Sequence, residues 1–484
     1  MFLEYRKVIS RLKESEMQII DFFPELLLKE MSPFDLERLK THESSGLSID
    51  TRTLRKGDFF IALKGRGSAG ALFLKEAIER GASGVLISAT DLKNLHTQGE
   101  ESILKSISFW VSPRETCEYV ADMAALYYPF KPEYLMAVTG TNGKTSVSFF
   151  VHQIMYALGL PSAALGTVGL FVLGGHHTQE EIKYSNLTTP DVVKVHKILS
   201  ELFDQGVQSL VLEASSHGID QNRLKGLTFS SAAFTNFSQD HLDYHGSMAE
   251  YFDVKCRLFQ EILLPGKTAV LNADIPEFDR LEKIVRKRKQ HLLTYGLRGE
   301  DLRLLNLKSH DNALEMEFEV WGEKHSVRLP LIGNYQAHNV LCALGLVMGA
   351  LKITSHDTEI LNKAIQVLSY LQPPPGRLEF VGKTRLGASV YVDYAHTPDA
   401  FERVLTSLRP HTKRRLWILF GCGGDRDSIK RSLMGKMAYQ YADFVVITDD
   451  NPRSEDPKNI RKQVMEYIPE CASNVFEIPD REVQ

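Results

Sequence analysis

The sequence predicts an α/β protein built around a mainly parallel sheet. Short apolar runs at 209–213, 232–236 and 268–272 have the length and composition of buried strands, and helical stretches alternate with them. Such alternation is typical of strands joined by crossover helices. A glycine-rich loop at 140–146 follows another apolar run and precedes a helical pattern. The chain of 484 residues is too long for one ordinary core, so we expect about three domains.

Composition and charge exclude several classes of protein. Hydrophobic residues make up 43% of the chain, charged residues make up 24%, and the net charge is −4. These values fit a globular protein and give no reason to expect nucleic acid as a partner. No apolar run approaches the roughly 18 residues of a membrane span, and the N-terminus lacks a signal-peptide pattern. We therefore expect no membrane insertion and a cytoplasmic protein. The five cysteines form no metal-type pair, which favours reduced thiols.

Patterns along the chain divide it into three blocks. We expect, in order, a helical segment to about residue 46, a strand at 57–63, a helix at 73–81, a strand at 84–88, and an antiparallel pair at 313–320 and 325–331. Three consecutive prolines at 373–375 would stop a helix and stiffen a linker. Beyond that linker we predict three more buried strands, at 390–394, 415–421 and 444–448.

The loop at 140–146 has the most specific chemistry. Its residues are Gly140, Thr141, Asn142, Gly143, Lys144, Thr145 and Ser146. Its backbone N–H groups, the lysine and the dipole of the following helix would all face an anion. The usual Walker pattern needs a glycine where this chain has Val138, so the loop is a shortened form. The alternative is a glycine-rich turn with a surface lysine. We predict a nucleoside triphosphate site.

Several side chains near this loop are candidate metal ligands. Glu213 ends the strand at 209–213, where a nucleotide-bound Mg²⁺ needs an oxygen ligand, and Thr145 would supply a hydroxyl. The alternative for Glu213 is an acid that caps the next helix. The loop at 237–246 contains two acids and two histidines, which fits a metal site or a polar loop rich in helix caps. By pattern alone, Lys255 is a solvated helix lysine.

Three polar loops follow the predicted strands of the third block, at 393–398, 421–427 and 449–453. Ligands of open α/β sheets bind at such strand ends. Arg426 and Arg453 have the chemistry for bidentate recognition of carboxylate or phosphate. The Asn-Pro pair at 451–452 could equally form a simple turn.

Together these motifs resemble the Mur ligase family, the ATP-dependent amino-acid-adding enzymes of peptidoglycan precursor synthesis. The resemblance runs from about residue 46 to the C-terminus and rests on motifs at 139–145, 188–191, 213–223, 240–246, 376–379 and 393–399. It implies a three-domain Mur ligase architecture. A UDP-substrate-binding domain would occupy 1–133, a central P-loop ATPase-like domain with a parallel sheet 134–371, and a Rossmann-like amino-acid-binding domain 372–484.

The resemblance also implies a reaction. We expect a ligase that adds meso-2,6-diaminopimelate to the D-glutamate of UDP-N-acetylmuramoyl-L-Ala-D-Glu, using ATP and Mg²⁺ and passing through an acyl phosphate. Family members with Asp-Asn-Pro-Arg, as at 450–453 here, use this diamino acid, whereas lysine-adding members lack the arginine. A guanidinium can recognise the second carboxylate that lysine does not have. The sequence does not indicate an oligomeric state.

Residue roles follow from the same resemblance. Lys144, His241 and Lys255 would be catalytic, with Lys255 carbamylated by CO₂. The metal ligands would be Thr145, Glu213, His241 and Lys255. Besides the phosphate loop, ATP would contact Asn339, Arg377 and Asp393. The UDP substrate would contact Thr51, Thr188, Thr189, Ser215, Gln221 and Arg223. Diaminopimelate would contact Arg426, Asp450, Asn451 and Arg453.

One family motif has no counterpart in this sequence. Related enzymes continue past the region matching 478–482 into a strand carrying Gly-Lys-Gly-His-Glu, whose glycine and glutamate contact the diamino acid. We therefore expect a truncated C-terminal domain. Two alternatives remain: a folylpolyglutamate synthetase, which shares the short phosphate loop, and a protein that binds nucleotide without turnover. The motif at 450–453 and the uridine-type first block argue against the synthetase.

Overall fold

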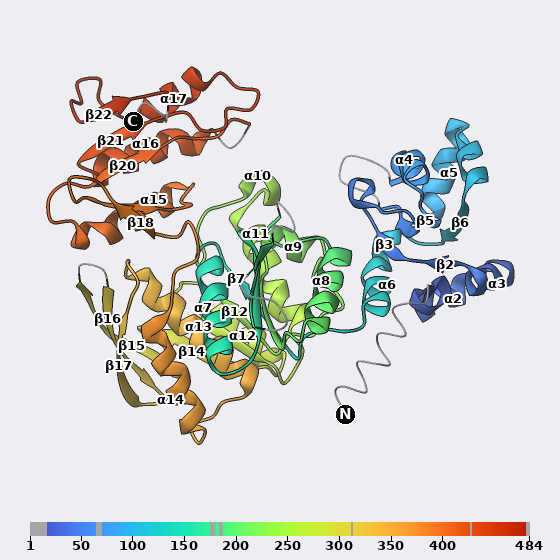
Figure 1. The fold of residues 1–484 in the computed structure, drawn as a ribbon, viewed down its shortest axis with the longest axis horizontal. Helices are drawn as coiled ribbons and strands as arrows, with labels where there is room; N and C mark the ends of the chain where they lie inside the picture. Colours follow the sequence, from blue (N-terminus) through green and yellow to red (C-terminus); the bar gives the residue numbers. More distant parts are fainter. Residues whose placement is uncertain are drawn as a thin grey trace. The chain divides into compact units, whose positions relative to one another are not determined.

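The computed structural model describes residues 17–63, 70–174, 180–182, 187–310, 313–425 and 428–480 (Figure 1). The chain forms two compact units. The first runs to Pro132 and also includes Pro190–Gly206 and Asp220–Leu227, and the second comprises the remainder. The three-domain division at residues 133 and 371 stays a prediction.

A parallel sheet in the order β3-β4-β5-β6 organises the first unit. Its strands are β3 (Gly46–Ser48), β4 (Asp58–Ile61), β5 (Gly84–Ser88) and β6 (Ser108–Ser112). Phe59 and Ile61 of β4 pack into one apolar cluster, and Phe60 packs into a second. Successive strand residues point to opposite faces, so this sheet is buried on both sides, as parallel sheets usually are.

The helices of the first unit agree only in part with the expected pattern. They are α2 (Glu25–Glu30), α3 (Pro33–Thr41), α4 (Leu74–Glu79), α5 (Ala89–Gln98), α6 (Val120–Tyr127) and α8 (Val192–Asp204). The expected helix at 73–81 corresponds to α4, and the strands at 57–63 and 84–88 to β4 and β5. Within the described part, the first 46 residues hold α2 and α3, but also the pair β1 (Met17–Gln18) and β2 (Glu43–Ser44), which the helical pattern does not predict.

An eleven-stranded sheet forms the centre of the second unit, in the order β10-β9-β8-β11-β7-β12-β13-β14-β15-β16-β17. The strands are β7 (Tyr134–Thr139), β8 (Ser162–Gly166), β9 (Gly169–Leu173), β10 (Glu180–Ile182), β11 (Ser209–Glu213), β12 (Ser231–Phe234), β13 (Thr268–Asn272), β14 (His291–Gly296), β15 (Leu302–His310), β16 (Ala313–Val320) and β17 (Glu323–Leu329). Pairing is parallel from β8 to β15. The predicted mainly parallel sheet is confirmed.

Strand β7 lies between β11 and β12 and carries the phosphate loop at its C-terminal end. Two helices, α7 (Lys144–Ala157) and α13 (Tyr335–Leu351), share one apolar cluster with this strand. Met136 and Val138 of β7 are fully buried in that cluster, together with Phe150 and Leu344 of the helices. The loop is therefore attached to the most buried part of the sheet.

The far end of the large sheet is antiparallel. Strands β16 and β17 confirm the antiparallel pair expected at 313–320 and 325–331, and β15 pairs with β16 as a further antiparallel partner. The remaining helices of this region are α9 (Ser216–Asp220), α10 (Leu242–His245), α11 (Met248–Arg257), the π-helical turn η6 (Leu258–Ile262), α12 (Phe278–Lys287) and α14 (Thr358–Val367). In the part of the chain that the structure describes, no helix is long and apolar enough to cross a membrane.

The proline-rich segment leads into a small α/β region. Its start is tied to α7, because Gln153 Nε2 donates to Gln372 O (2.9 Å) and Gln372 N donates to Gln153 Oε1 (2.8 Å). The region contains an antiparallel hairpin, a parallel sheet in the order β20-β21-β22, and three helices. The elements are β18 (Glu379–Lys383), β19 (Ser389–Val392), α15 (Pro398–Leu408), β20 (Trp417–Phe420), α16 (Ile429–Tyr441), β21 (Phe444–Ile447), α17 (Pro457–Met465) and β22 (Val475–Glu477).

The prediction of three buried strands in this region is wrong for β19, and for β20 it holds on one face only. β19, predicted at 390–394, belongs to the exposed two-stranded hairpin, and Val392 is 47% exposed. In β20, Phe420 packs against the helices, whereas Trp417 is 55% exposed. The Trp417 ring stacks on Phe444 of β21 at 4.3 Å on that open face. A continuous apolar run does not reveal whether one face or both faces of a strand are covered.

Candidate active site

The phosphate loop between β7 and α7 needs glycine at two positions. Gly140 has φ 139°, and a Cβ there would lie 2.0 Å from Thr235 Oγ1. Gly143 has φ 87°, and its Cβ would lie 2.5 Å from Asn339 Oδ1. L-residues rarely adopt such angles. No described side chain caps α7, which begins directly after Gly143. Its first N–H groups form the kind of terminus that binds phosphate.

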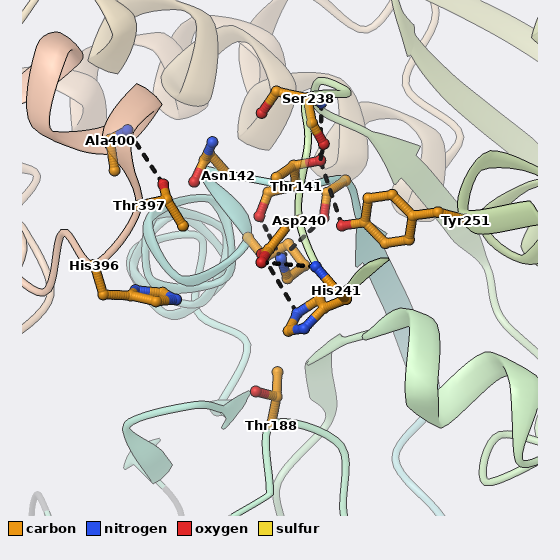
Figure 2. Close-up of polar contacts among 12 residues, drawn as sticks. Thr141, Asn142, Thr188, Ser238, Asp240, His241, Tyr251, His396, Thr397 and Ala400 are labelled. Carbon is orange, nitrogen blue, oxygen red and sulfur yellow. Dashed lines mark hydrogen bonds and ion pairs between the residues drawn. The ribbon is translucent and has the colours of Figure 1, made fainter. Parts of the chain in front are cut away.

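Neighbouring side chains hold the loop in place (Figure 2). Asn142 N donates to Asn236 Oδ1 (2.9 Å), and Asn236 Nδ2 donates back to Asn142 O (2.9 Å). Thr141 Oγ1 donates to Ser238 O (3.1 Å) and lies 3.4 Å from the Tyr251 hydroxyl. These partners follow β12 or lie on α11. Hydrogen bonds to these neutral groups thus help to fix the loop conformation.

Two lysines converge on one carbonyl oxygen of the loop. Lys144 Nζ donates to Gly140 O (2.9 Å) and Thr141 O (2.7 Å), and Lys255 Nζ also donates to Gly140 O (2.9 Å). Lys255 is 1% exposed, so its interpretation as a solvated helix lysine is wrong. Burial and the Lys144 ammonium lower the pKa of Lys255 well below its usual range. Burial also lowers the pKa of Lys144, while Glu213 opposes that shift. The amine of Lys255 is therefore readily neutral.

Two of the expected magnesium ligands, Glu213 and Thr145, are oxygen donors suited to a Mg²⁺ ion that nucleotide phosphates also coordinate. Glu213 ends β11, paired with Val138 of β7, and is buried. Its two carboxylate oxygens accept from Thr167 N (3.0 Å) and Thr167 Oγ1 (3.1 Å). Thr145 is buried in the first turn of α7. Mg²⁺ commonly takes one or two carboxylates and completes its shell with phosphate oxygens and water, so this oxygen donor set is suitable.

The second expected metal site has a mixed donor set. His241 follows Asp240, and its Nε2 lies 3.4 Å from Asp240 Oδ2 (Figure 2). Its ring is perpendicular to that of His217, 4.9 Å away. Burial lowers the pKa of His241, which favours the neutral imidazole that binds metals. Lys255 as an ammonium ion would repel a cation. Among the described residues, no three His, Cys, Asp or Glu side chains gather as a metal-binding group. The role of His241 as a metal ligand stays a prediction.

Three of the expected UDP-substrate residues meet in the second unit. Thr189 Oγ1 donates to Glu213 O (2.7 Å) and lies 2.9 Å from Ser215 Oγ. Thr188 Oγ1 lies 3.0 Å from Thr167 Oγ1. Because Thr167 also contacts the Glu213 carboxylate, these hydroxyls and the candidate magnesium ligand form one hydrogen-bonded group.

The other expected UDP-substrate residues belong to the first unit. Thr51 Oγ1 donates to Glu76 Oε2 (2.7 Å). Arg223 Nε donates to Gln221 Oε1 (3.1 Å), and Arg223 NH2 donates to the same oxygen (2.6 Å). Their role in binding the UDP substrate stays a prediction.

Of the expected ATP residues outside the loop, Asn339 and Arg377 lie at the phosphate loop, whereas Asp393 supports the backbone near Arg377. Asn339 on α13 lies against Gly143 and donates through Nδ2 to Gln336 Oε1 (2.9 Å). Arg377 NH2 donates to Thr145 Oγ1 (3.3 Å), so the structure brings it to the phosphate loop. Asp393 accepts from Leu378 N and Ala395 N, both at 2.8 Å. Its carboxylate therefore braces the segment that carries Arg377.

Three of the expected diamino-acid residues lie in a loop after β21. Asn451 Oδ1 accepts from Arg453 N (3.2 Å), and the Arg453 guanidinium donates to Gly424 O. Asp450, Asn451 and Arg453 are exposed at this strand end. Arg426 lies outside the described residues. The structure thus brings three of the four expected residues into one loop.

One carboxylate at the phosphate loop was not among the candidates. Asp399 on α15 accepts from Asn142 Nδ2 (3.1 Å) and Ser238 Oγ (3.2 Å). It also pairs with Arg403 one turn later (3.1 Å). The helix begins after Thr397, whose hydroxyl accepts from Ala400 N (3.3 Å; Figure 2). The only signal in the sequence was the position of Asp399 at the end of the motif at 393–399.

Comparisons with known proteins agree with this geometry. The family model of the Mur ligase middle domain matches residues 138–347, and that of the Mur ligase glutamate ligase domain matches residues 376–483. A UDP-N-acetylmuramoyl-L-alanyl-D-glutamate–2,6-diaminopimelate ligase from Chelativorans sp. strain BNC1 is 40% identical over 438 residues, covering 90% of this chain and 85% of that protein. The chain belongs to the Mur ligase family.

Solved structures place this Mur ligase beside others of the same fold. A structure of a UDP-N-acetylmuramoyl-L-alanyl-D-glutamate–2,6-diaminopimelate ligase matches with a TM-score of 0.65 at 29% identity, covering 97% of this chain and 90% of that one. The folylpolyglutamate synthase of Mycobacterium tuberculosis complexed with ADP gives 0.59 at 19% identity, covering 75% and 84%. At that identity the synthase shares the fold alone.

Proposed function

We propose that this Mur ligase joins meso-2,6-diaminopimelate to the D-glutamate of UDP-N-acetylmuramoyl-L-alanyl-D-glutamate at the expense of ATP. The 40% identity to the Chelativorans ligase over 90% of the chain supports the substrates. The phosphate loop supports the chemistry, and it is the observation that carries the proposal. Lys144 in the loop, Lys255 beside it, the N-terminus of α7 and the buried Glu213 suit transfer of a phosphoryl group.

The first step uses the second unit's loop. The D-glutamate γ-carboxylate attacks the γ-phosphorus of ATP, ADP leaves, and an acyl phosphate forms. Lys144 would exchange its bond to Gly140 O for a phosphate oxygen and so neutralise developing charge. Thr145 and Glu213 would hold Mg²⁺, which offsets charge on the β- and γ-phosphates when bound.

The second step forms the amide bond. The diamino acid's amine attacks the acyl carbon, phosphate leaves with the bonding electron pair, and the nitrogen gives up a proton. Arg453 would orient the nucleophile by binding its distal carboxylate, which lysine does not have. Asp450 and Asn451 would contact the neighbouring ammonium and carboxylate groups. This assignment predicts selectivity for diaminopimelate over lysine.

We also propose that Lys255 carries a carbamate in the active enzyme. Its neutral amine can add to CO₂ with loss of a proton, which replaces a cation by an anion. The buried position and lowered pKa of Lys255 support this reaction. The carbamate would bind a second Mg²⁺ together with His241. Because ATP and nucleotide-linked precursors are the substrates, we place the enzyme in the cytoplasm.

Incubation of the purified protein with the UDP-linked dipeptide, ATP and Mg²⁺ tests the proposal. One reaction contains meso-diaminopimelate and a parallel one L-lysine, and each is followed by phosphate release and by mass spectrometry of the UDP product. We expect stoichiometric phosphate and a new amide with diaminopimelate only. Product with lysine alone, or phosphate without any amide, would overturn it.

A further inference from the structure

Two loops at the C-terminal ends of β20 and β21 lie side by side. Gly424 N donates to Asn451 O (2.9 Å), and a Cβ on Gly424 would lie 1.8 Å from Pro452 O. The first loop is 421–425, and the second is 450–455. Neither loop contains a helix or strand, so this single backbone bond is supplemented by side chains.

Arg431 is the residue that ties these loops to the protein interior. It lies in the first turn of α16 and is 1% exposed. Its NH1 donates to Glu455 Oε2 (2.7 Å) and Gln463 Oε1 (2.7 Å). Its NH2 donates to Glu455 Oε1 (2.8 Å) and Gly423 O (3.0 Å). One guanidinium therefore bridges α17 and both loops.

Glu455 completes the connection from the other side. Besides its two bonds from Arg431, its Oε1 accepts from Asp425 N (2.6 Å). Asp425 in turn accepts from Ser454 Oγ (2.6 Å). The bonds from Arg431 hold the pKa of Glu455 at about 2, so this carboxylate stays ionised across the physiological range.

Arg453 depends on this arrangement for its position. It has φ 49°, a left-handed conformation that a non-glycine residue adopts only when its surroundings fix it. Its guanidinium donates to Gly424 O and lies 3.0 Å from the Cβ position of Gly423. Gly423 is also the residue whose carbonyl receives Arg431.

We propose that Arg431 and Glu455 form a clamp that positions Arg453 and thereby sets the enzyme's selectivity between diamino acids. The inference rests on the proposed function, because it concerns the residue expected to read the second carboxylate. Arg431 and Glu455 touch no reacting atom in this scheme and are positioning residues.

The clamp requires arginine specifically. A guanidinium is planar and presents its donors in a fixed fork, which here meets a carboxylate, an amide and a carbonyl at once. A lysine ammonium keeps the charge but is a point donor on a flexible stem. Arg431→Lys therefore retains the charge of the clamp and removes its geometry.

The test compares Arg431→Lys with the parent enzyme in three measurements. We expect the KM for meso-diaminopimelate to rise about 10- to 100-fold, as when charged hydrogen bonds are lost, and the preference over lysine to fall by a similar factor. The KM values for ATP and the UDP substrate should change little. Positional isotope exchange in γ-labelled ATP, without any amine, should continue because it reports acyl-phosphate formation alone.

Two further variants keep the test decisive. Arg409→Lys is the matched control, since Arg409 donates to Asp443 Oδ2 (2.8 Å) and Tyr441 O (2.8 Å) near the other end of α16. It should leave the diamino-acid preference unchanged. Glu455→Gln changes the more exposed partner of the ion pair. It should shift the preference for diaminopimelate over lysine in the same direction as Arg431→Lys, and it keeps the test valid if Arg431→Lys folds poorly.

The outcomes distinguish a failure of the clamp from a failure of the proposed function. An unchanged preference in folded Arg431→Lys, or in Glu455→Gln, would overturn the clamp while the parent enzyme still makes its amide. A parent enzyme that makes no amide with either amine would refute the proposed function instead.

Discussion

The phosphate loop and the paired loops after β20 and β21 both lie at the C-terminal ends of parallel strands but are held by different sets of partners. The phosphate loop is held by bonds to the Asn236 side chain and to Ser238 O. It is also held by Lys144 and Lys255, which both donate to Gly140 O. The paired loops are fixed by the ion pair of Arg431 with Glu455. The phosphate loop and the loop after β21 each follow a strand that lies between two parallel neighbours. They differ in their partners: several neutral and charged groups hold the phosphate loop, whereas one ion pair and its hydrogen bonds hold the paired loops.

The two regions have different roles under the proposed function: the phosphate loop acts in phosphoryl transfer, and the paired loops bind the amine. The loop proposed to act in phosphoryl transfer is held by residues from several elements, as expected where precise geometry lowers a barrier. The loops proposed to select the amine are braced by the side chains of Arg431 and Glu455, and residues 450, 451 and 453 are exposed. Substitutions in the first region should therefore affect turnover, and substitutions in the second should affect which amine is used.

The largest expected effect is that of Lys144→Ala. Removing the ammonium at the phosphate loop should lower kcat by about 10²- to 10³-fold, the usual cost of one transition-state donor. Phosphate release under saturating substrates measures it, and circular dichroism confirms the fold. Lys144→Arg, which keeps the charge, should recover part of the loss. A kcat within threefold of the parent would contradict the role of the lysine.

The next effect is a loss of stability on mild acidification. His152 on α7 is buried, and burial lowers its pKa from 6.5 to about 4. The unfolded chain therefore binds this proton more readily, and stability falls as the pH drops from 6.5 towards 4. The loss should reach about 3 kcal/mol.

The clamp has a different pH window. The pKa of Glu455 is lowered from 4.5 to about 2, so its contribution is present above pH 4.5 and is lost only below it. Urea unfolding between pH 7 and pH 4 should show that the free energy of unfolding falls as the pH falls. His152→Gln should make this dependence on pH shallower, whereas Glu455→Gln should leave it unchanged. Equal slopes in the parent and His152→Gln would refute the assignment to His152.

Arg453→Ala should give an intermediate effect confined to the amine. Loss of a charged bond to the distal carboxylate should raise the KM for meso-diaminopimelate about 10- to 30-fold. The KM for ATP and the rate of isotope exchange should not change, because acyl-phosphate formation precedes use of the amine. A drop in isotope exchange would show that Arg453 also affects acyl-phosphate formation at the phosphate loop, which would contradict the separation of the two roles.

The smallest effect should come from the open face of the C-terminal sheet. Trp417 stacks on Phe444 but is half exposed, so Trp417→Ala should cost about 1 kcal/mol in the free energy of unfolding. Thermal unfolding measures the change. A loss above about 3 kcal/mol, the cost of a buried aromatic, would show that another surface covers this face.

Sequence reasoning succeeded where short-range patterns determine the structure. The strands at 209–213 and 268–272 match β11 and β13 residue for residue, because parallel strands buried on both faces carry a continuous apolar run along their middle. The phosphate loop was equally predictable, since its glycines are required by positive φ and close neighbours.

The rest depended on contacts between distant residues. Nothing near Lys255 in the sequence indicates that its amine meets Gly140 O, 115 positions away. The same holds for Arg431 and Glu455, whose residue types fit an ordinary solvated helix and loop. The exposure of β19 was missed because an apolar run does not record how many neighbours a strand has.

The tight packing of the paired loops restricts how this enzyme can evolve. Any side chain at Gly424 would meet Pro452 O at 1.8 Å, and one at Gly421 would meet Thr448 O at 2.5 Å. Insertions or larger residues at these glycines would separate the loops. Under the proposed function, we therefore expect a change of diamino acid to come from replaced side chains such as Arg453 and not from a rebuilt loop backbone.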